Sequence, residues 1–116
     1  MLYRKDERRY QIIEHMKGGE GEFQLLHIAE AENMGNKATL FARGVLPVGA
    51  SVGLHRHEGN MEICCFVSGR ALVKEDECKY EVSPGDISIC RDGESHSVIN
   101  TGDEELVYMV LVLKTL

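Results

Sequence analysis

Short apolar runs separated by glycine-containing turns extend along most of the chain, and this pattern restricts the fold more than any other feature of the sequence. Turn residues such as Pro47–Gly49 and Pro84–Asp86 lie between the runs. Many short strands with regular turns are typical of an all-β sandwich or barrel. The predicted strands are residues 23–29, 38–46, 62–67, 71–74, 80–82, 87–90, 97–99 and 106–113.

The N-terminal part of the chain has a different pattern. Tyr10, Ile13 and Met16 recur at helical spacing, and a Gly-Gly pair at 18–19 would end a helix. We therefore predict a short helix within residues 3–17. The sequence divides into an N-terminal segment, residues 1–22, and one strand-rich domain, residues 23–116.

Charge and composition exclude several partners. The 13 Lys and Arg residues against 19 Asp and Glu residues give a net charge of −6, which argues against nucleic acid because phosphate binding needs a basic face. The longest apolar run is far shorter than the ~20 residues of a membrane span, and no signal peptide is visible. We therefore expect no membrane contact and a cytoplasmic protein whose cysteines, Cys64, Cys65, Cys78 and Cys90, are reduced.

The last predicted strand, Leu106–Leu113, is apolar at nearly every position. A strand with one face in water alternates between apolar and polar residues, so this strand should be covered on both faces. In a chain of 116 residues the second cover would be another subunit, which predicts a homodimer.

Three histidines and one glutamate form a pattern typical of a metal site. His55 and His57 are two residues apart, so on a strand they point to the same face. A turn can return Glu62 to the same ion, and His96 can approach from a facing strand. Imidazole nitrogen and carboxylate oxygen are ligands that divalent transition metals prefer. Spacing alone leaves open that the histidine pair is simply exposed on a strand.

Glycines around these residues complete two motifs. The first contains Gly49, His55, His57, Glu62 and Gly69. The second contains Gly85, Arg91, Gly93, His96 and Asn100, with Arg91 where proline is usual. In order and spacing, both motifs resemble those of the cupin superfamily.

This resemblance implies a double-stranded β-helix, the jelly-roll barrel of the cupins. It also implies one divalent transition metal ion (Fe, Mn, Ni, Zn, Co or Cu), held by His55, His57, Glu62 and His96. Cupins often exchange N-terminal segments within a homodimer, which gives residues 1–22 a second possible role.

Four protein ligands on an ion that accepts more than four leave positions open for a small-molecule ligand. We therefore predict a metal-dependent enzyme that acts on a small carboxylate, hydroxy-carbonyl or sugar-type metabolite. Isomerisation, decarboxylation, lyase chemistry and dioxygenation all remain open, with Glu62 as a catalytic ligand. The alternative is a non-catalytic cupin that binds or senses a small molecule.

Three further side chains are candidates for the pocket. Cys64 shares the strand face of Glu62, and is either a small buried residue or a thiol that contacts substrate. Arg43 is either a clamp for a carboxylate or phosphate, or an exposed surface residue. Glu58 lies in the turn between the ligands and is either an acid–base group or a solvated carboxylate.

Overall fold

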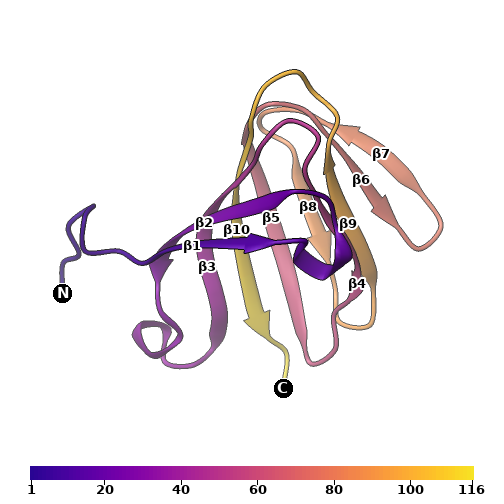
Figure 1. Cartoon of the computed structure of the whole chain (residues 1–116). Coiled ribbons are helices and arrows are strands. Elements are labelled where there is room, and N and C mark those ends of the chain that lie inside the picture. The colour runs from indigo at the N-terminus through magenta and orange to yellow at the C-terminus, as the bar shows by residue number, and fades with distance from the viewer.

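A computed structural model describes all residues from Met1 to Leu116 and contains two antiparallel sheets that face each other (Figure 1). In spatial order, the six-stranded sheet contains β1 (Tyr10–Glu14), β2 (Glu22–Ala29), β3 (Ala38–Leu46), β10 (Leu106–Lys114), β5 (Asn60–Ser68) and β8 (Ile87–Cys90). The four-stranded sheet contains β4 (Ser51–Arg56), β9 (Ser95–Asn100), β6 (Ala71–Glu75) and β7 (Lys79–Val82). The only helices are two 3-10 turns, η1 (Met16–Gly18) and η2 (Ala31–Met34). The all-β jelly-roll prediction is confirmed.

The predicted strands are all present, and their ends agree within two residues. Two strands were not assigned a range from the sequence, β1 and β4. The second of these has a glycine, Gly53, at its centre and a ligand, His55, near its end. Only Val52 is fully buried among its residues, so β4 has no continuous apolar run that would mark it as a strand.

The predicted helix within residues 3–17 is wrong. Residues Tyr10–Glu14 form β1 and pair antiparallel with β2, which supplies their hydrogen bonds. Ile13 packs against the core from the strand, and Met16 does so from η1. The helical spacing of these two residues therefore arises because a strand and the turn after it both touch the same core. In the single chain β1 pairs within its own sheet, and its exchange in a dimer stays a prediction.

Turn η1 lies directly against β4, backbone to backbone. A Cβ atom added to Gly53 would lie 2.1 Å from the carbonyl oxygen of Lys17, and one on Gly19 would lie 2.1 Å from that of Ser51. Only glycine allows such an approach. The N-terminal segment thus supports the strand that carries His55.

The hydrophobic core fills the space between the two sheets. Tyr108 of β10 lies at its centre, with ring centroids 5.7 Å from Phe23 and 5.3 Å from Phe66. Strand β10 pairs with β3 on one side and β5 on the other, and its inward side chains Tyr108, Val110 and Val112 are buried in the core. Its outer residues Met109 and Leu111 are only half-buried in the single chain. No helix in the structure has the length and apolar character needed to cross a bilayer.

Candidate metal centre

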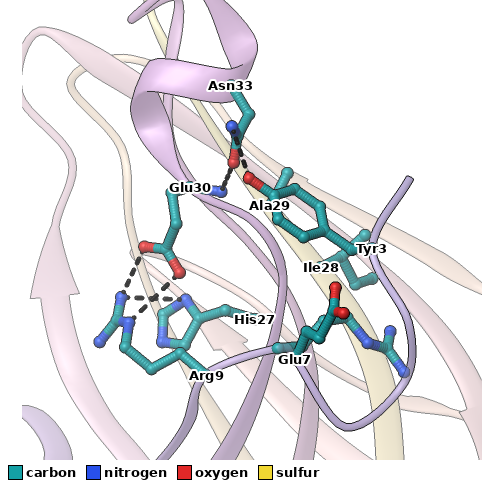
Figure 2. A pocket seen from close by; sticks show the side chains of 9 residues that line it. Tyr3, Glu7, Arg9, His27, Ile28, Ala29, Glu30 and Asn33 are labelled. Carbon is teal, nitrogen blue, oxygen red and sulfur yellow. Dashed lines mark hydrogen bonds and ion pairs between the residues drawn. The ribbon is translucent and has the colours of Figure 1, made fainter. Parts of the chain in front are cut away.

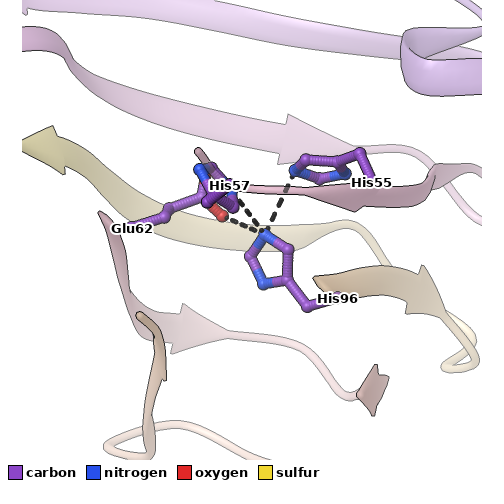
Figure 3. A group of neighbouring side chains, drawn as sticks. All are labelled: His55, His57, Glu62 and His96. Atoms are coloured by element: carbon purple, nitrogen blue, oxygen red, sulfur yellow. Dashed lines mark hydrogen bonds and ion pairs between the residues drawn. The ribbon is translucent and has the colours of Figure 1, made fainter. Parts of the chain in front are cut away.

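The four predicted ligands lie together inside one end of the barrel (Figure 3). One ligand atom from each residue lies within 4.8 Å of the others. Nε2 of His96 is 3.2 Å from Nε2 of His55, 3.2 Å from Nε2 of His57 and 2.8 Å from Oε2 of Glu62. The three rings and the carboxylate thus direct donor atoms toward one point.

Strand pairing and two turns bring these residues together. His55 on β4 faces His96 on β9 across the four-stranded sheet. The backbone N–H of His57 donates to the carbonyl of Glu94, and the N–H of Gly93 donates to the carbonyl of His57. These bonds hold the end of β4 against the loop before β9. A turn with a left-handed glycine at position 59 then returns the chain to β5, which carries Glu62.

Hydrogen bonds at Nδ1 fix the orientation and the tautomer of two of the imidazoles, those of His55 and His57. Nδ1 of His55 lies 2.8 Å from the carbonyl oxygen of Gly53. A carbonyl only accepts, so Nδ1 carries the proton and Nε2 keeps its lone pair. Nδ1 of His57 lies 2.7 Å from Oδ1 of Asn60, with the same consequence. Partners of this kind orient metal-binding histidines in proteins.

Burial and charge favour the protonation states that a metal needs. Burial lowers the pKa of His55, against the hydrogen bond to Gly53, so its ring stays neutral. Burial pushes the pKa of Glu62 upward, but the hydrogen bond from His96 and the electrostatic attraction of the neighbouring imidazoles outweigh it, so the pKa falls below its ordinary value. Neutral imidazoles and an ionised carboxylate are the forms that coordinate metals.

The donor set fits a divalent transition metal ion. Three imidazole nitrogens and one carboxylate oxygen are borderline ligands in a largely enclosed site, where the Glu62 side chain is 13% exposed and that of His96 only 1%. Two of the three rings already direct lone pairs inward. The cluster can therefore hold one ion while His55 and His57 keep their hydrogen bonds to Gly53 and Asn60.

Cys64 lies beside the cluster. Its Sγ is 3.4 Å from Oε2 of Glu62, and its side chain is completely buried. Burial, and then the nearby carboxylate of Glu62, raise the pKa of this thiol well above its ordinary value. A thiol of this kind stays protonated and donates to the carboxylate, so it acts on the ligand Glu62 rather than as a nucleophile.

The structure does not bring Arg43 or Glu58 to the cluster. Residues alternate along β3, and the completely buried Ala42 forces Arg43 onto the exposed outer face. Glu58 has a side chain that is 78% exposed and pairs with Arg56 at 3.3 Å outside the barrel. Both side chains therefore lie on the surface, which was the alternative to a role in the pocket for each of them.

Two residues that the sequence analysis did not single out do lie beside the ligands. Strand register places Cys90 of β8 opposite Glu62, and Glu75 of β6 opposite His96. Residues directly opposite in an antiparallel pair point to the same face. The alternation along the predicted strand 71–74, extended by one residue, would have placed Glu75 inside.

The departure of the second motif at Arg91 leaves its turn intact. The N–H of Glu94 donates to the carbonyl of Arg91 at 3.0 Å, and Gly93 adopts a left-handed φ of 87°. The side chain of Glu94 also accepts a hydrogen bond from the N–H of Arg91 at 2.8 Å. A glutamate thus supplies the restraint that proline usually gives, and His96 keeps its place.

A cavity of about 90 Å³ lies between the N-terminal segment and the end of β2 (Figure 2). Several of its polar side chains are paired with one another. Arg9 lies 3.0 Å from Glu30, and Nδ1 of His27 lies 3.4 Å from Arg9. Nε2 of His27 is 2.9 Å from the side-chain oxygen of Gln11. These contacts tie β1 to β2 and give His27 a structural role.

Comparisons with known proteins agree with the fold and the motifs. A family model described as the cupin domain matches residues 42–112. The chain is 39% identical over 113 residues to an oxalate-binding protein of Thermotoga maritima, covering 97% of this chain and 93% of the relative. The crystal structure of a predicted oxalate decarboxylase from the same organism superposes with a TM-score of 0.92 and 38% identity, covering 98% of this chain and 99% of the other.

A sugar phosphate isomerase of the cupin superfamily from Silicibacter pomeroyi superposes with a TM-score of 0.76 at 19% identity, covering 99% of this chain and 76% of that one. At this identity the likeness concerns the fold alone. The family match over the barrel, the close Thermotoga relative and the two motifs lead to one conclusion: the chain belongs to the cupin superfamily.

Proposed function

We propose that this cupin binds one divalent transition metal ion through His55, His57, Glu62 and His96, and that the ion in turn holds a small carboxylate such as oxalate. The convergence of three Nε2 atoms and a carboxylate within 4.8 Å carries the metal assignment. The relative that is 39% identical and named an oxalate-binding protein supports the ligand class.

Each residue of the site would contribute differently to binding the metal ion and the carboxylate. A bound divalent ion would supply Lewis-acid polarisation of the ligand's carboxylate. His55 and His57 contribute neutral donors, because their Nδ1 atoms are bonded elsewhere. Glu62 contributes one negative charge, held in place by the thiol of Cys64. Four protein ligands leave coordination positions for both oxygens of a chelating acid.

Decarboxylation is the reaction we propose to test first, since the solved relative at 38% identity is described as a predicted oxalate decarboxylase. Binding without turnover is the second candidate, because the relative at 39% identity is named for binding alone. The two differ in one observable: only the enzyme converts oxalate to carbon dioxide and formate.

Elemental analysis tests the metal centre. Protein purified without chelators or a metal-affinity tag should contain about one metal ion per chain, and His96→Ala should lose most of it. Calorimetric titration of oxalate into the metal-loaded and the chelator-treated protein then tests the ligand. Equal metal content in wild type and variant, or equal oxalate binding with and without metal, would refute the proposal.

We further propose that the chain forms a homodimer through the outer face of its six-stranded sheet. Two rows of side chains cross β8, β5, β10 and β3 in register: Ile89, Ile63, Leu111 and Phe41, and beside them Ile87, Cys65, Met109 and Arg43. Seven of these eight side chains are uncharged, and Ile87 and Ile89 are 61% and 49% exposed. A second copy presents the same two rows, in which Arg43 is the one charged side chain, so no acidic side chains of these rows are brought together, which matters for a chain of net charge −6.

The cellular compartment is also part of this proposal. All four cysteines are free thiols, although Cys64 and Cys90 are both buried within the barrel. Free thiols are typical of proteins in a reducing compartment. We propose that the protein works in the cytoplasm.

A further inference from the structure

Strand register arranges the side chains at the level of the metal cluster as one ring around the inside of the barrel. Across the six-stranded sheet the ring contains Leu40, Val112, Glu62 and Cys90. Across the four-stranded sheet it contains Glu75, His96 and His55. The predicted ligands occupy only part of this ring. The remaining members are the walls that a metal-bound molecule would meet.

Glu75 is the polar member of that wall, and its inward direction follows from a second observation. Ala71 and Val73, which precede it at alternate positions of β6, are completely buried, whereas Lys74, between Val73 and Glu75, is exposed. Tyr80 of β7 stands opposite Val73 in register, and its hydroxyl donates to Oε1 of Glu75. The carboxylate is therefore held beside His96, with its second oxygen left as an acceptor.

The phenol remains a donor over the whole physiological range. Burial, followed by the hydrogen bond to Glu75, raises the pKa of Tyr80 to about 12, against a smaller opposing effect of Ser88. Tyr80 is also partly exposed, at the edge of the four-stranded sheet. The pair thus lies where the ring meets the solvent-exposed edge of the sheet.

No Lys or Arg side chain forms an ion pair with Glu75, and Arg91, the cation whose charge it feels, is paired with Glu94. Arg43 lies on the outer face, and Lys74 points away from the ring. Arg56 and Arg91 are exposed and already paired with neighbouring glutamates. A dianion bound to the metal by one carboxylate would therefore bring its other carboxylate toward Glu75. The two negative groups would repel each other strongly, because the barrel interior screens charge less than water does.

We propose that Glu75, positioned by Tyr80, is the ligand-selecting residue of the pocket. Its free oxygen accepts a hydrogen bond from a hydroxyl or a protonated carboxyl group of an acid whose carboxylate is bound to the metal. The pocket then prefers a monoanionic acid that carries a hydroxyl next to its carboxylate, or a dicarboxylate with one proton, over a full dianion. This inference rests on the proposed metal-dependent binding of a carboxylate and names the class of carboxylate.

The test compares two small acids at pH 8, where oxalate is a dianion and glycolate is a hydroxy monoanion. Both are titrated calorimetrically into metal-loaded wild type, Glu75→Gln, Tyr80→Phe and the control Glu81→Gln. Glu81 lies on the same strand pair, is exposed and occupies the opposite face, so its variant removes the same charge outside the barrel.

Wild type should bind glycolate more tightly than oxalate. Glu75→Gln should bind oxalate about tenfold more tightly and glycolate about tenfold more weakly, as expected for removal of one charged hydrogen-bonding group. Tyr80→Phe should change both affinities in the same directions by a smaller factor. Glu81→Gln should match wild type, and all four proteins should contain the same amount of metal.

The failures are distinguishable. If Glu75→Gln behaves like Glu81→Gln while wild type binds either acid in a metal-dependent way, the selecting role of Glu75 is refuted and the proposed function stands. Loss of metal in Glu75→Gln would also refute it, because Glu75 would then be a ligand. If metal-loaded wild type binds neither acid, both the inference and the proposed function are refuted.

Discussion

At the scale of single residues, the chemistry of the centre depends on atoms that never touch the metal position. The carbonyl of Gly53 and the amide of Asn60 decide which nitrogen of each ring carries the proton. If the proton moved to Nε2, that histidine would face the cluster with a donor instead of a lone pair. The contacts behind the ligands therefore help to set the metal affinity of the site.

Asn60→Ala should weaken metal binding even though all four ligands remain. Loss of a second contact to a ligating histidine typically costs about 10- to 100-fold in metal affinity. Competitive titration against a chelator measures the change, with His57→Ala as the reference for complete loss of a ligand. An unchanged affinity would show that the contact to Asn60 does not orient His57.

A second prediction concerns His27. Burial, and then the charge of Arg9, lower the pKa of His27 below its ordinary value of 6.5. The unfolded chain therefore binds this proton more readily than the folded chain, so the contribution to stability is unchanged above pH 6.5 and declines as the pH falls below it. Between pH 7 and pH 5, His27→Gln should lose less stability than wild type in urea unfolding.

His15→Gln is the matched control for that experiment, since His15 is exposed. Its unfolding free energy should keep the pH dependence of wild type. If the dependence of His27→Gln also equalled that of wild type, the folded protein would bind the His27 proton as readily as the unfolded chain.

At the scale of elements, η1 and β4 act as one unit because their backbones touch. Strand β4 lies at the edge of the four-stranded sheet and is paired only with β9 inside that sheet. The N-terminal turn covers it from outside. The position of His55 is therefore fixed partly by a segment that comes almost forty residues earlier in the chain.

Gly53→Ala should destabilise the protein and loosen the metal site together. The added methyl group would collide with the carbonyl of Lys17, so η1 and β4 must separate, at a cost of about 1–3 kcal/mol. Urea unfolding and chelator competition measure the two effects. Gly35→Ala is the control: its Cβ would meet nothing within 4 Å, so only backbone strain of about 1 kcal/mol and no loss of metal affinity are expected.

The elements also show which parts of the molecule can be predicted from sequence. Strands bounded by glycine turns, such as β3 and β8, were predicted with their full ranges, because alternation and turn chemistry are local properties. Strand β1 was missed because its partner, β2, is what makes it a strand. The four ligands could be predicted because the motifs that carry them resemble those of a known family.

The positions of the remaining pocket residues depended on register, which a single sequence does not determine. Arg43 fell on the outer face because the parity of β3 is set by Ala42 in the core. Glu75 and Cys90 came to the ligands through pairing with β9 and β5, far away in sequence. Local sequence patterns do not predict which strands pair or in which register, so the positions of these side chains could not be predicted.

At the scale of the whole molecule, the single chain leaves its most apolar face uncovered. The inner face of β10 is buried in the core, whereas Met109 and Leu111 face outward among other apolar side chains, and their cover by a second subunit stays a prediction. A second copy would bury them without exposing any other face. The unpaired edges of β8 and β1 limit this sheet on both sides.

The wild-type protein should therefore have the mass of a dimer by light scattering at micromolar concentration. Ile89→Lys places a charge on the exposed apolar part of this face and should give a monomer. Val48→Lys is the control, because Val48 is similarly exposed but lies in a turn away from the sheet. A monomeric mass for wild type would exclude the proposed interface.

The ligands come from both layers of the barrel: His55 and His96 from one sheet, Glu62 from the other. A bound ion would cross-link the two sheets, which are otherwise joined by the core and the connecting loops. Such a cross-link adds to the stability of the fold in proportion to the logarithm of the free metal concentration. The rate at which this protein is degraded in a cell would then depend on the supply of the ion, so its abundance would rise when the metal is plentiful and fall when it is scarce.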